Sequence, residues 1–258
     1  MKRLMYLICF FAIGFNLYSE SVFTYDLKKD IPLVAVSAAV FLSPFIIDVK
    51  PGNLPSNLDR NDVNVFDRRF MFSDGSILET IASGQKYSLL ALPIITPLAV
   101  AGWDIRNDFN TWLTYGIMYA QAVALTHGTV NIIKNSVERY RPRVYFSDHP
   151  SANDNSSFPS GSTAMAFMGA TFLNCTFSAE YPDSPWKIPI IVGSNTLAVS
   201  VGISRITSGK HFLTDVLAGA ALGSFYGWLM PTLHRRTNHE NRISFYFTGN
   251  GGLISLKL

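Results

Sequence analysis

Long stretches of this sequence are almost free of charged residues, and polar stretches separate them. After an apolar run at the N-terminus, six further apolar segments occupy residues 31–47, 87–103, 111–133, 163–177, 188–203 and 212–233. A helix needs about 20 apolar residues to cross the hydrocarbon core of a bilayer. Several segments fall slightly short of that length, so a soluble bundle of buried helices is the alternative. Six such runs in one chain favour a transmembrane bundle.

The N-terminus has the layout of a signal peptide. Lys2 and Arg3 precede the apolar run 4–18, and Ser19-Glu20-Ser21 offers small residues at a spacing typical of cleavage sites. An uncleaved membrane anchor is the alternative. We therefore divide the chain into a signal peptide or anchor at 1–21, a membrane-embedded domain at 22–236 and a tail at 237–258.

The polar stretches and the tail complete the predicted fold. Residues 48–86 are too polar for a core and are expected to cap one face of the membrane. In the tail, residues 243–247 and 253–256 flank the sequence Thr248-Gly-Asn-Gly-Gly, which predicts a β-hairpin. Two strands cannot close a barrel. The predicted fold is therefore all-α, a six-helix transmembrane bundle with a short C-terminal β-hairpin.

Composition agrees with a membrane protein and excludes other classes. Hydrophobic residues make up 48% of the chain and charged residues 15%, below the roughly 25% of an ordinary soluble domain. The net charge is +3 and no run of Lys or Arg occurs, so we expect no nucleic-acid partner. Cys9 and Cys175 each lie inside an apolar segment, and the sequence has no metal-binding cluster. We therefore expect no disulfide framework, no metal and no cofactor.

Three polar clusters lie at the ends of apolar segments, on the same predicted face. The first ends in Arg141 and Pro142. Lys134 and Arg141 are seven residues apart, which places them on one side of a helix, two turns from each other. Pro142 then ends the helix. Taken alone, this cluster is also typical of a basic flank that anchors a membrane helix.

The second cluster, residues 158–163, directly precedes an apolar segment. Ser160 is a natural N-cap, and Gly161 lets the backbone approach a ligand closely. The unpaired N–H groups and the helix dipole at such an N-terminus attract anions. Taken alone, the cluster predicts only a well-capped helix.

The third cluster contains Arg205, His211 and Asp215. The spacing of His211 and Asp215 at the start of a helix lets the carboxylate reach the imidazole. An Asp that fixes the tautomer of a His leaves the other ring nitrogen available as a base or nucleophile. A charged Asp in an apolar helix is costly without such a partner. A purely structural His–Asp pair is the alternative.

The three clusters together supply cations and a helix N-terminus around one histidine, which is what a phosphate group requires. Their pattern is Lys-x6-Arg-Pro at 134–142, Pro-Ser-Gly at 159–161 and Ser-Arg-x5-His-x3-Asp at 204–215. This pattern resembles the signature of the type 2 phosphatidic acid phosphatase and vanadium haloperoxidase superfamily. The resemblance covers about residues 111–233, and the two earlier apolar segments fit the six-helix membrane branch.

The resemblance implies a role for each matching residue. Five residues would hold the phosphate oxygens and are called the cradle below: Lys134, Arg141, Arg205, Ser160 and Gly161 through its amide. His211 would attack phosphorus and form a phosphohistidine, and Asp215 would orient the imidazole and stabilise its charge. Water would then release inorganic phosphate, and the family needs no metal for this reaction.

One position departs from the family pattern. The second motif of the family ends in a histidine that protonates the leaving oxygen, and here that position is Ser162. A hydroxyl is a very poor acid at neutral pH, and His149 is the nearby candidate to replace it. The missing histidine also weakens the haloperoxidase interpretation. A leaving group that needs no proton, such as a phosphate monoester with a second pKa of about 6, would tolerate the change.

We therefore expect a membrane lipid phosphatase that prefers a diphosphate such as a polyprenyl diphosphate. Two alternatives remain from the sequence, an inactive relative that binds phospholipid head groups and a soluble secreted acid phosphatase. Basic residues divide almost evenly between the two predicted faces, so charge does not orient the bundle. The resemblance alone suggests a multi-pass protein of the bacterial inner membrane with its site on the periplasmic face.

Overall fold

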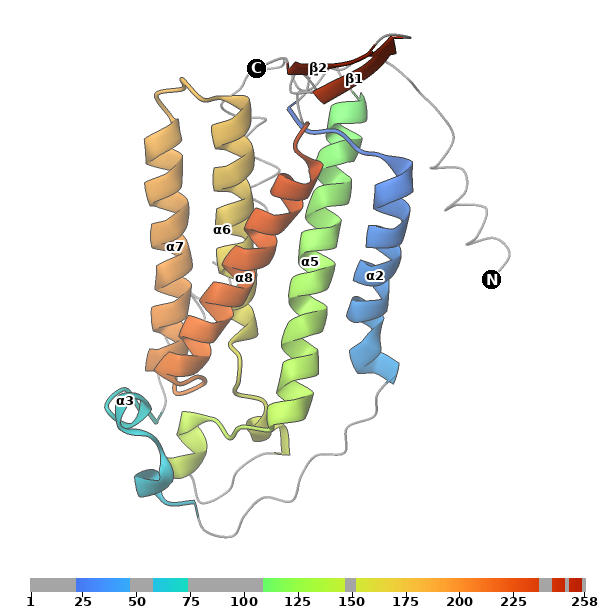
Figure 1. Ribbon diagram of the computed structural model, residues 1–258. Coiled ribbons are helices and arrows are strands. Elements are labelled where there is room, and N and C mark those ends of the chain that lie inside the picture. Colours follow the sequence, from blue (N-terminus) through green and yellow to red (C-terminus); the bar gives the residue numbers. More distant parts are fainter. Residues whose placement is uncertain are drawn as a thin grey trace.

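Five long helices stand side by side in a bundle (Figure 1). The computed structural model describes residues 22–46, 58–73, 109–146, 152–236, 243–248 and 251–256. The helices are α2 (Leu27–Ile46), α5 (Phe109–Val137), α6 (Gly161–Glu180), α7 (Lys187–Thr207) and α8 (Leu213–His234). They match five of the six predicted segments. The predicted segment 87–103 and the N-terminal segment 1–21 lie outside the described residues.

The outer surface of the bundle is apolar, as a bilayer requires. Within the described residues, α2, α7 and α8 are long and apolar enough to cross a membrane. Phe45, Ile188 and Leu217 on these helices expose 71%, 63% and 59% of their surface. Helix α6 instead contacts α5, α7 and α8 and buries small residues such as Ala166 and Ala170. The all-α transmembrane bundle predicted from the sequence is confirmed, and the soluble alternative is not favoured.

Helices α6 and α8 touch along their backbones because glycine occurs at every fourth position of α8. A Cβ atom placed on Gly219, Gly223 or Gly227 would lie 2.4, 1.9 or 2.5 Å from a carbonyl oxygen of Ser160, Ala164 or Met168. Small residues permit such close approach of membrane helices. We call these three glycines the glycine ladder. It holds the N-terminal ends of α6 and α8 next to each other, which is where the second and third motifs lie.

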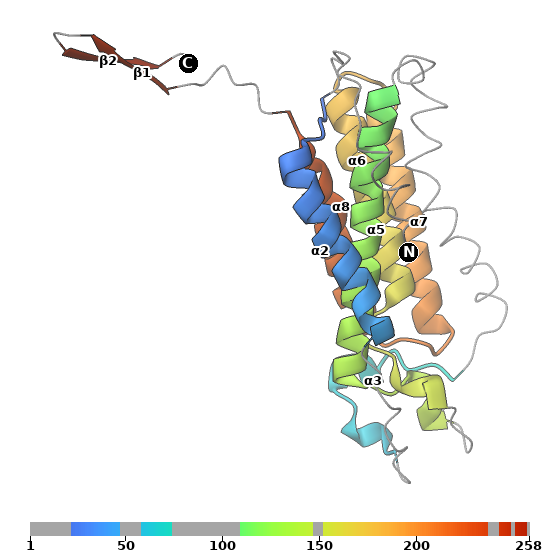
Figure 2. The same cartoon turned by 90° about the vertical axis from the view of Figure 1, so that its right-hand side faces the viewer.

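Backbone and side-chain contacts join α2 to α8 at the opposite end of the bundle. Thr24 N–H donates to the carbonyl oxygen of His234 at 2.9 Å, and Phe23 forms an isolated β-bridge with Arg235. The buried His234 also pairs with Asp30 through Nε2 and Oδ1, 2.6 Å apart. Further along the chain, β1 (Ile243–Thr248) and β2 (Gly251–Leu256) form the predicted antiparallel hairpin (Figure 2).

Four short helices gather at the motif end of the bundle (Figure 1). They are η1 (Arg60–Asp62), α3 (Val65–Arg68), η3 (Pro142–Phe146) and η4 (Ala152–Asn155). Arg60 links two of them, since its Nε donates to the Tyr145 carbonyl at 3.3 Å and its guanidinium lies 3.8 Å from the centre of the Phe146 ring. The described part of the first polar stretch therefore covers this end, as the sequence predicts.

Candidate active site

The three motifs, which are far apart in the sequence, meet at one end of the bundle. Lys134 lies in the last turn of α5, and its Nζ would be 3.9 Å from a Cβ atom placed on Gly161, the first residue of α6. Arg205 lies in the last turn of α7, and its carbonyl oxygen accepts from His211 N–H at 3.2 Å. Helix ends from α5, α6, α7 and α8 thus bring the predicted cradle and the predicted nucleophile together.

Hydrogen bonding fixes the tautomer of His211. Its Nδ1 is 2.7 Å from the carbonyl oxygen of Ser157. A carbonyl oxygen only accepts, so Nδ1 carries the proton and Nε2 carries the lone pair. Nε2 has no hydrogen-bond partner among the residues that the structure describes. The imidazole therefore presents an unprotonated nitrogen.

The surroundings of His211 keep the ring neutral. Burial lowers its pKa to about 4, and the positive charges of Lys134 and Arg141 act in the same direction. Asp215 favours the charged form but does not outweigh them. His211 is thus unprotonated at neutral pH, which is the state that a nucleophile requires.

Asp215 lies close to His211 but is held by other groups. Its Oδ2 is 3.7 Å from Nδ1 of His211, which is longer than a hydrogen bond. The same oxygen accepts from Phe212 N–H at 2.9 Å and from the Ser157 hydroxyl. Ser157 therefore connects the pair, because its carbonyl binds the imidazole and its hydroxyl binds the carboxylate. The spacing in the sequence predicts direct contact between His211 and Asp215 and gives no sign of Ser157.

A second aspartate and an arginine extend this arrangement. Arg139 donates from Nη1 to Oδ1 of Asp215 at 2.6 Å and from Nη2 to Oδ2 of Asp67 at 2.7 Å. Its guanidinium also lies 4.0 Å from the centre of the Phe212 ring. Asp67 in turn accepts from the amide and the hydroxyl of Thr214, at 2.9 and 2.7 Å. We call Asp67, Arg139 and Asp215 the aspartate bridge.

Both carboxylates of the aspartate bridge are fully buried, whereas the Arg139 side chain is 23% exposed. Burial alone would raise the pKa of Asp67, but hydrogen bonds from Arg139 and Thr214 outweigh it and lower the pKa. Asp67 therefore stays charged at neutral pH. The Arg139 cation thus lies between two carboxylates, and one of them, Asp215, is the neighbour of His211.

Arg139 and Asp67 are not apparent as site residues from the sequence, for different reasons. Arg139 occupies one of the variable positions between Lys134 and Arg141 in the first motif. Glu138 just before it adopts a positive φ of 47° where α5 ends, and the path of the backbone at Arg139 follows from that turn. Asp67 lies in the first polar stretch, where Asn64 caps α3 by accepting from Asp67 N–H at 3.0 Å. The Asn-x-x-Asp spacing could have predicted that cap, but not the contact with the third motif.

The remaining predicted residues take several positions. Ser160 is the N-cap of α6, but its hydroxyl pairs with that of Thr163 at 2.8 Å and caps no backbone amide. Arg141 is largely buried, which lowers its pKa, and its Nε has no hydrogen-bond partner within the described residues. Ser162 lies half-buried in the first turn of α6, and His149 is outside the described residues. No group of His, Cys, Asp and Glu in the described ranges could hold a metal ion.

Comparisons with known proteins agree with the motifs. The PAP2 superfamily matches residues 113–239, which include every cluster above. The chain is 36% identical over 148 residues to a lipid A 1-phosphatase of Porphyromonas gingivalis, a match that covers 56% of this chain but only 30% of that protein. It is 26% identical over 252 residues to a protein of Schizosaccharomyces pombe named a probable diacylglycerol pyrophosphate phosphatase, covering 82% of this chain and 84% of the relative.

A third relative is similar over most of its own length. The chain is 31% identical over 171 residues to a bacitracin transport permease protein of Bacillus licheniformis, covering 58% of this chain and 76% of the relative. The family match and the three motifs share the same region of the bundle, from α5 to α8. The chain belongs to the PAP2 superfamily.

Proposed function

We propose that this protein hydrolyses the phosphate or diphosphate head group of a membrane lipid. The observation that carries the proposal is the neutral, buried His211, whose Nε2 has no partner within the described residues and whose neighbours include the cations Lys134 and Arg141. The names of two relatives point the same way, since one is called a lipid A 1-phosphatase and another a probable diacylglycerol pyrophosphate phosphatase.

In the proposed reaction, Nε2 of His211 attacks phosphorus and the bond from phosphorus to the leaving oxygen breaks. The imidazole becomes a positively charged phosphohistidine, and its Nδ1–H remains bound to the Ser157 carbonyl. Asp215, 3.7 Å away, stabilises that charge. Water then attacks phosphorus, the bond to nitrogen breaks, and inorganic phosphate leaves. The cradle cations neutralise the charge on the phosphate oxygens throughout.

The leaving group determines the proposed preference for a diphosphate. An alkoxide, whose conjugate acid is about as weak an acid as water, needs a proton in the transition state. A phosphate monoester does not, because its second pKa is about 6. Ser162 cannot supply that proton, so a diphosphate is the better substrate. By resemblance, we place the site on the periplasmic face of a bacterial inner membrane.

The preference can be tested with substrates that share one tail. We expect the purified protein to release phosphate from a polyprenyl diphosphate at least about a hundredfold faster than from the matching monophosphate, since general acid catalysis contributes that much or more. Ser162→His should raise the monophosphate rate and leave the diphosphate rate almost unchanged. Faster hydrolysis of the monophosphate by the native protein would refute the preference. Release from neither lipid would favour the head-group-binding alternative.

The aspartate bridge should position Asp215 and, through it, His211. Asp67→Asn removes one of the two negative charges that flank Arg139, so Arg139 and Asp215 should shift. We expect kcat/KM to fall by between about tenfold and a hundredfold, the range that a small misplacement of catalytic groups produces. Steady-state kinetics and thermal unfolding of the same samples measure this.

Asp30→Asn is the matched control for Asp67→Asn. Asp30 is also a buried aspartate with a close side-chain partner, but that partner is His234, at the opposite end of the bundle. Both variants should lower the melting temperature, because each leaves a buried partner group without its carboxylate. Only Asp67→Asn should lower kcat/KM. Equal kcat/KM values for the two variants would show that the aspartate bridge contributes to stability and not to activity.

A further inference from the structure

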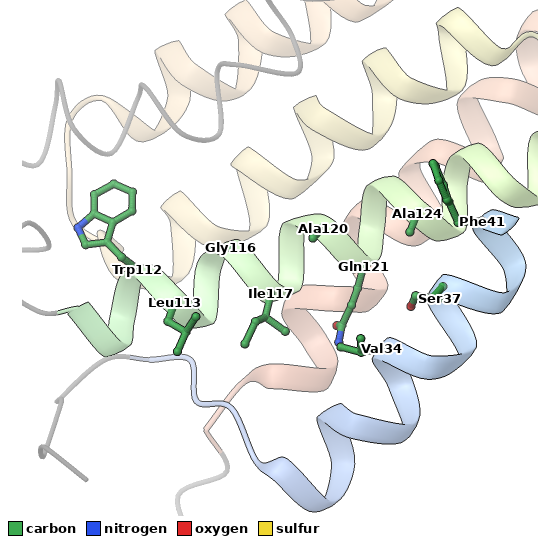
Figure 3. Close-up of a pocket in the computed structure, with 11 residues that line it drawn as sticks. Val34, Ser37, Phe41, Trp112, Leu113, Gly116, Ile117, Ala120, Gln121 and Ala124 are labelled. Atoms are coloured by element: carbon green, nitrogen blue, oxygen red, sulfur yellow. The ribbon is translucent and has the colours of Figure 1, made fainter. Parts of the chain in front are cut away.

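A concave region lies between α2 and α5 (Figure 3). It has a volume of about 610 Å³, within the range of small-molecule sites. Apolar side chains such as Val34, Phe41 and Ile117 line most of it, and none of the described residues that line it is charged. We call this region the α2–α5 groove.

Gln121 is the unusual residue of the α2–α5 groove. Figure 3 shows its amide directed into the groove between α5 and α2. The side chain is 3% exposed, and neither Nε2 nor Oε1 has a hydrogen-bond partner within the described part of the chain. Ser37, the other polar residue of the lining, already donates its hydroxyl to the Leu33 carbonyl at 2.7 Å. An unpaired buried amide is unfavourable, and most of all where no water is present.

The two unpaired atoms define the ligand that would satisfy them. Oε1 needs a donor and Nε2 needs an acceptor, and a single hydroxyl is both. The uncharged lining excludes a phosphate or carboxylate group, because nothing there would compensate its charge. The rest of the ligand must be apolar to match the remaining walls. We propose that the α2–α5 groove binds a neutral lipid alcohol, an apolar chain that carries one uncharged hydroxyl.

The groove is separate from the proposed catalytic site. Gln121 precedes Lys134 by 13 residues on α5, which corresponds to about 20 Å along the helix. A lipid whose phosphate occupies the cradle has only its hydrocarbon tail at that depth, and such a tail has no group to pair with the amide. The bound alcohol is therefore a second lipid molecule, and its binding does not depend on the hydrolytic reaction.

Photolabelling of the full-length protein in phosphatidylcholine vesicles tests the proposal. The probe is a long-chain alcohol that carries a diazirine, and the comparison compound is the same chain without the hydroxyl. We expect the alcohol to label peptides from α2 and the first half of α5 about tenfold more than the hydrocarbon, as two hydrogen bonds to the amide would produce. Excess unlabelled alcohol should abolish that labelling.

Two variants distinguish labelling that depends on the Gln121 amide from labelling that results from general contact with lipid. Gln121→Leu should remove the difference between alcohol and hydrocarbon, since the apolar groove remains. Asn195→Leu should preserve it, because Asn195 lies on α7 and already donates to the Ile191 carbonyl at 2.7 Å. Equal labelling of the native protein by both compounds, or a difference that survives in Gln121→Leu, overturns the proposal.

Phosphate release, measured on the same samples, tests the proposed function independently of the proposed lipid-alcohol site. Labelling that depends on the hydroxyl supports the groove whether or not the protein hydrolyses a lipid phosphate. Hydrolysis without such labelling supports the proposed function and overturns the groove.

Discussion

Replacing His211 by alanine should abolish phosphate release, with a fall in kcat of at least about 10⁴-fold, because it removes the proposed nucleophile and with it the proposed covalent intermediate. The Ser157 carbonyl would lose a hydrogen-bond partner, but the main packing of α6 on α8 lies elsewhere, along the glycine ladder. The variant should therefore remain folded. Phosphate release in detergent, measured beside thermal unfolding, tests both statements.

A control substitution at another histidine and a trapping experiment test whether the loss of activity is specific to His211. His127 lies on α5 within reach of the Asn131 amide and outside the cradle, so His127→Ala should retain most activity. Rapid quenching at alkaline pH, with substrate labelled in the transferred phosphorus, should trap labelled native protein and no labelled His211→Ala. Label that persists in His211→Ala would disprove the proposed nucleophile.

The lowered pKa of His211 adds an expected pH dependence to the same experiment. Below its pKa of about 4, a proton occupies Nε2, which can then no longer act as the proposed nucleophile. Once the ionisation of the substrate is divided out, kcat/KM should stay constant down to about pH 4 and then fall. The folded protein should also lose stability between about pH 6.5 and 4, since the unfolded chain then binds a proton that buried His211 does not.

Replacing Gly223 by alanine should destabilise the protein strongly. The added Cβ would lie 1.9 Å from the carbonyl oxygen of Ala164 and 2.9 Å from the amide nitrogen of Met168. Both are backbone atoms that cannot rotate away, so α6 and α8 must separate. We expect a loss of about 3 kcal/mol or more, at the upper end for overpacked cores. Thermal unfolding in detergent measures it, and activity should fall because the two motifs move apart.

Gly193→Ala is the control for this substitution. Gly193 is also a glycine within a membrane helix, but a Cβ placed there meets no atom within 4 Å. Its stability should be unchanged or slightly increased, because alanine has the higher helix propensity. If the two variants unfold at the same temperature, α6 and α8 do not pack as closely as described.

The sequence predicts the helices well because a membrane helix is recognisable by its length and its lack of charge. The five described helices start and end within about four residues of the predicted segments, and the hairpin matches its turn sequence. Close packing is harder to predict. The three glycines spaced by four in α8 are visible in the sequence, but the helix that they contact is not. The glycines face backbone carbonyl groups of α6, and every residue has such a group, so the sequence of α6 does not identify it as the partner.

The cradle and the aspartate bridge differ in the same way. Lys134 and Arg141 lie in one short motif and His211 lies in another, and the resemblance to the superfamily is what groups the two motifs into one predicted site. Asp67 and Arg139 meet across 72 residues, through a polar stretch whose path no periodicity describes. Ser157 acts partly through its carbonyl oxygen, which every residue possesses. Long-range contacts and backbone acceptors leave no pattern in a single sequence.

The glycine ladder has a consequence for the orientation of Asp215. Asp215 is four residues before Gly219, so it lies on the same stripe of α8 as the three glycines. Close contact with α6 fixes the rotation of α8 about its own axis, and that rotation turns the carboxylate toward Ser157. One residue inserted between Asp215 and Gly219 would turn the carboxylate by about 100°, because a helix has 3.6 residues per turn. The direction of the Asp215 carboxylate, which we propose stabilises the phosphohistidine, is thus set by glycines one to three turns further along α8.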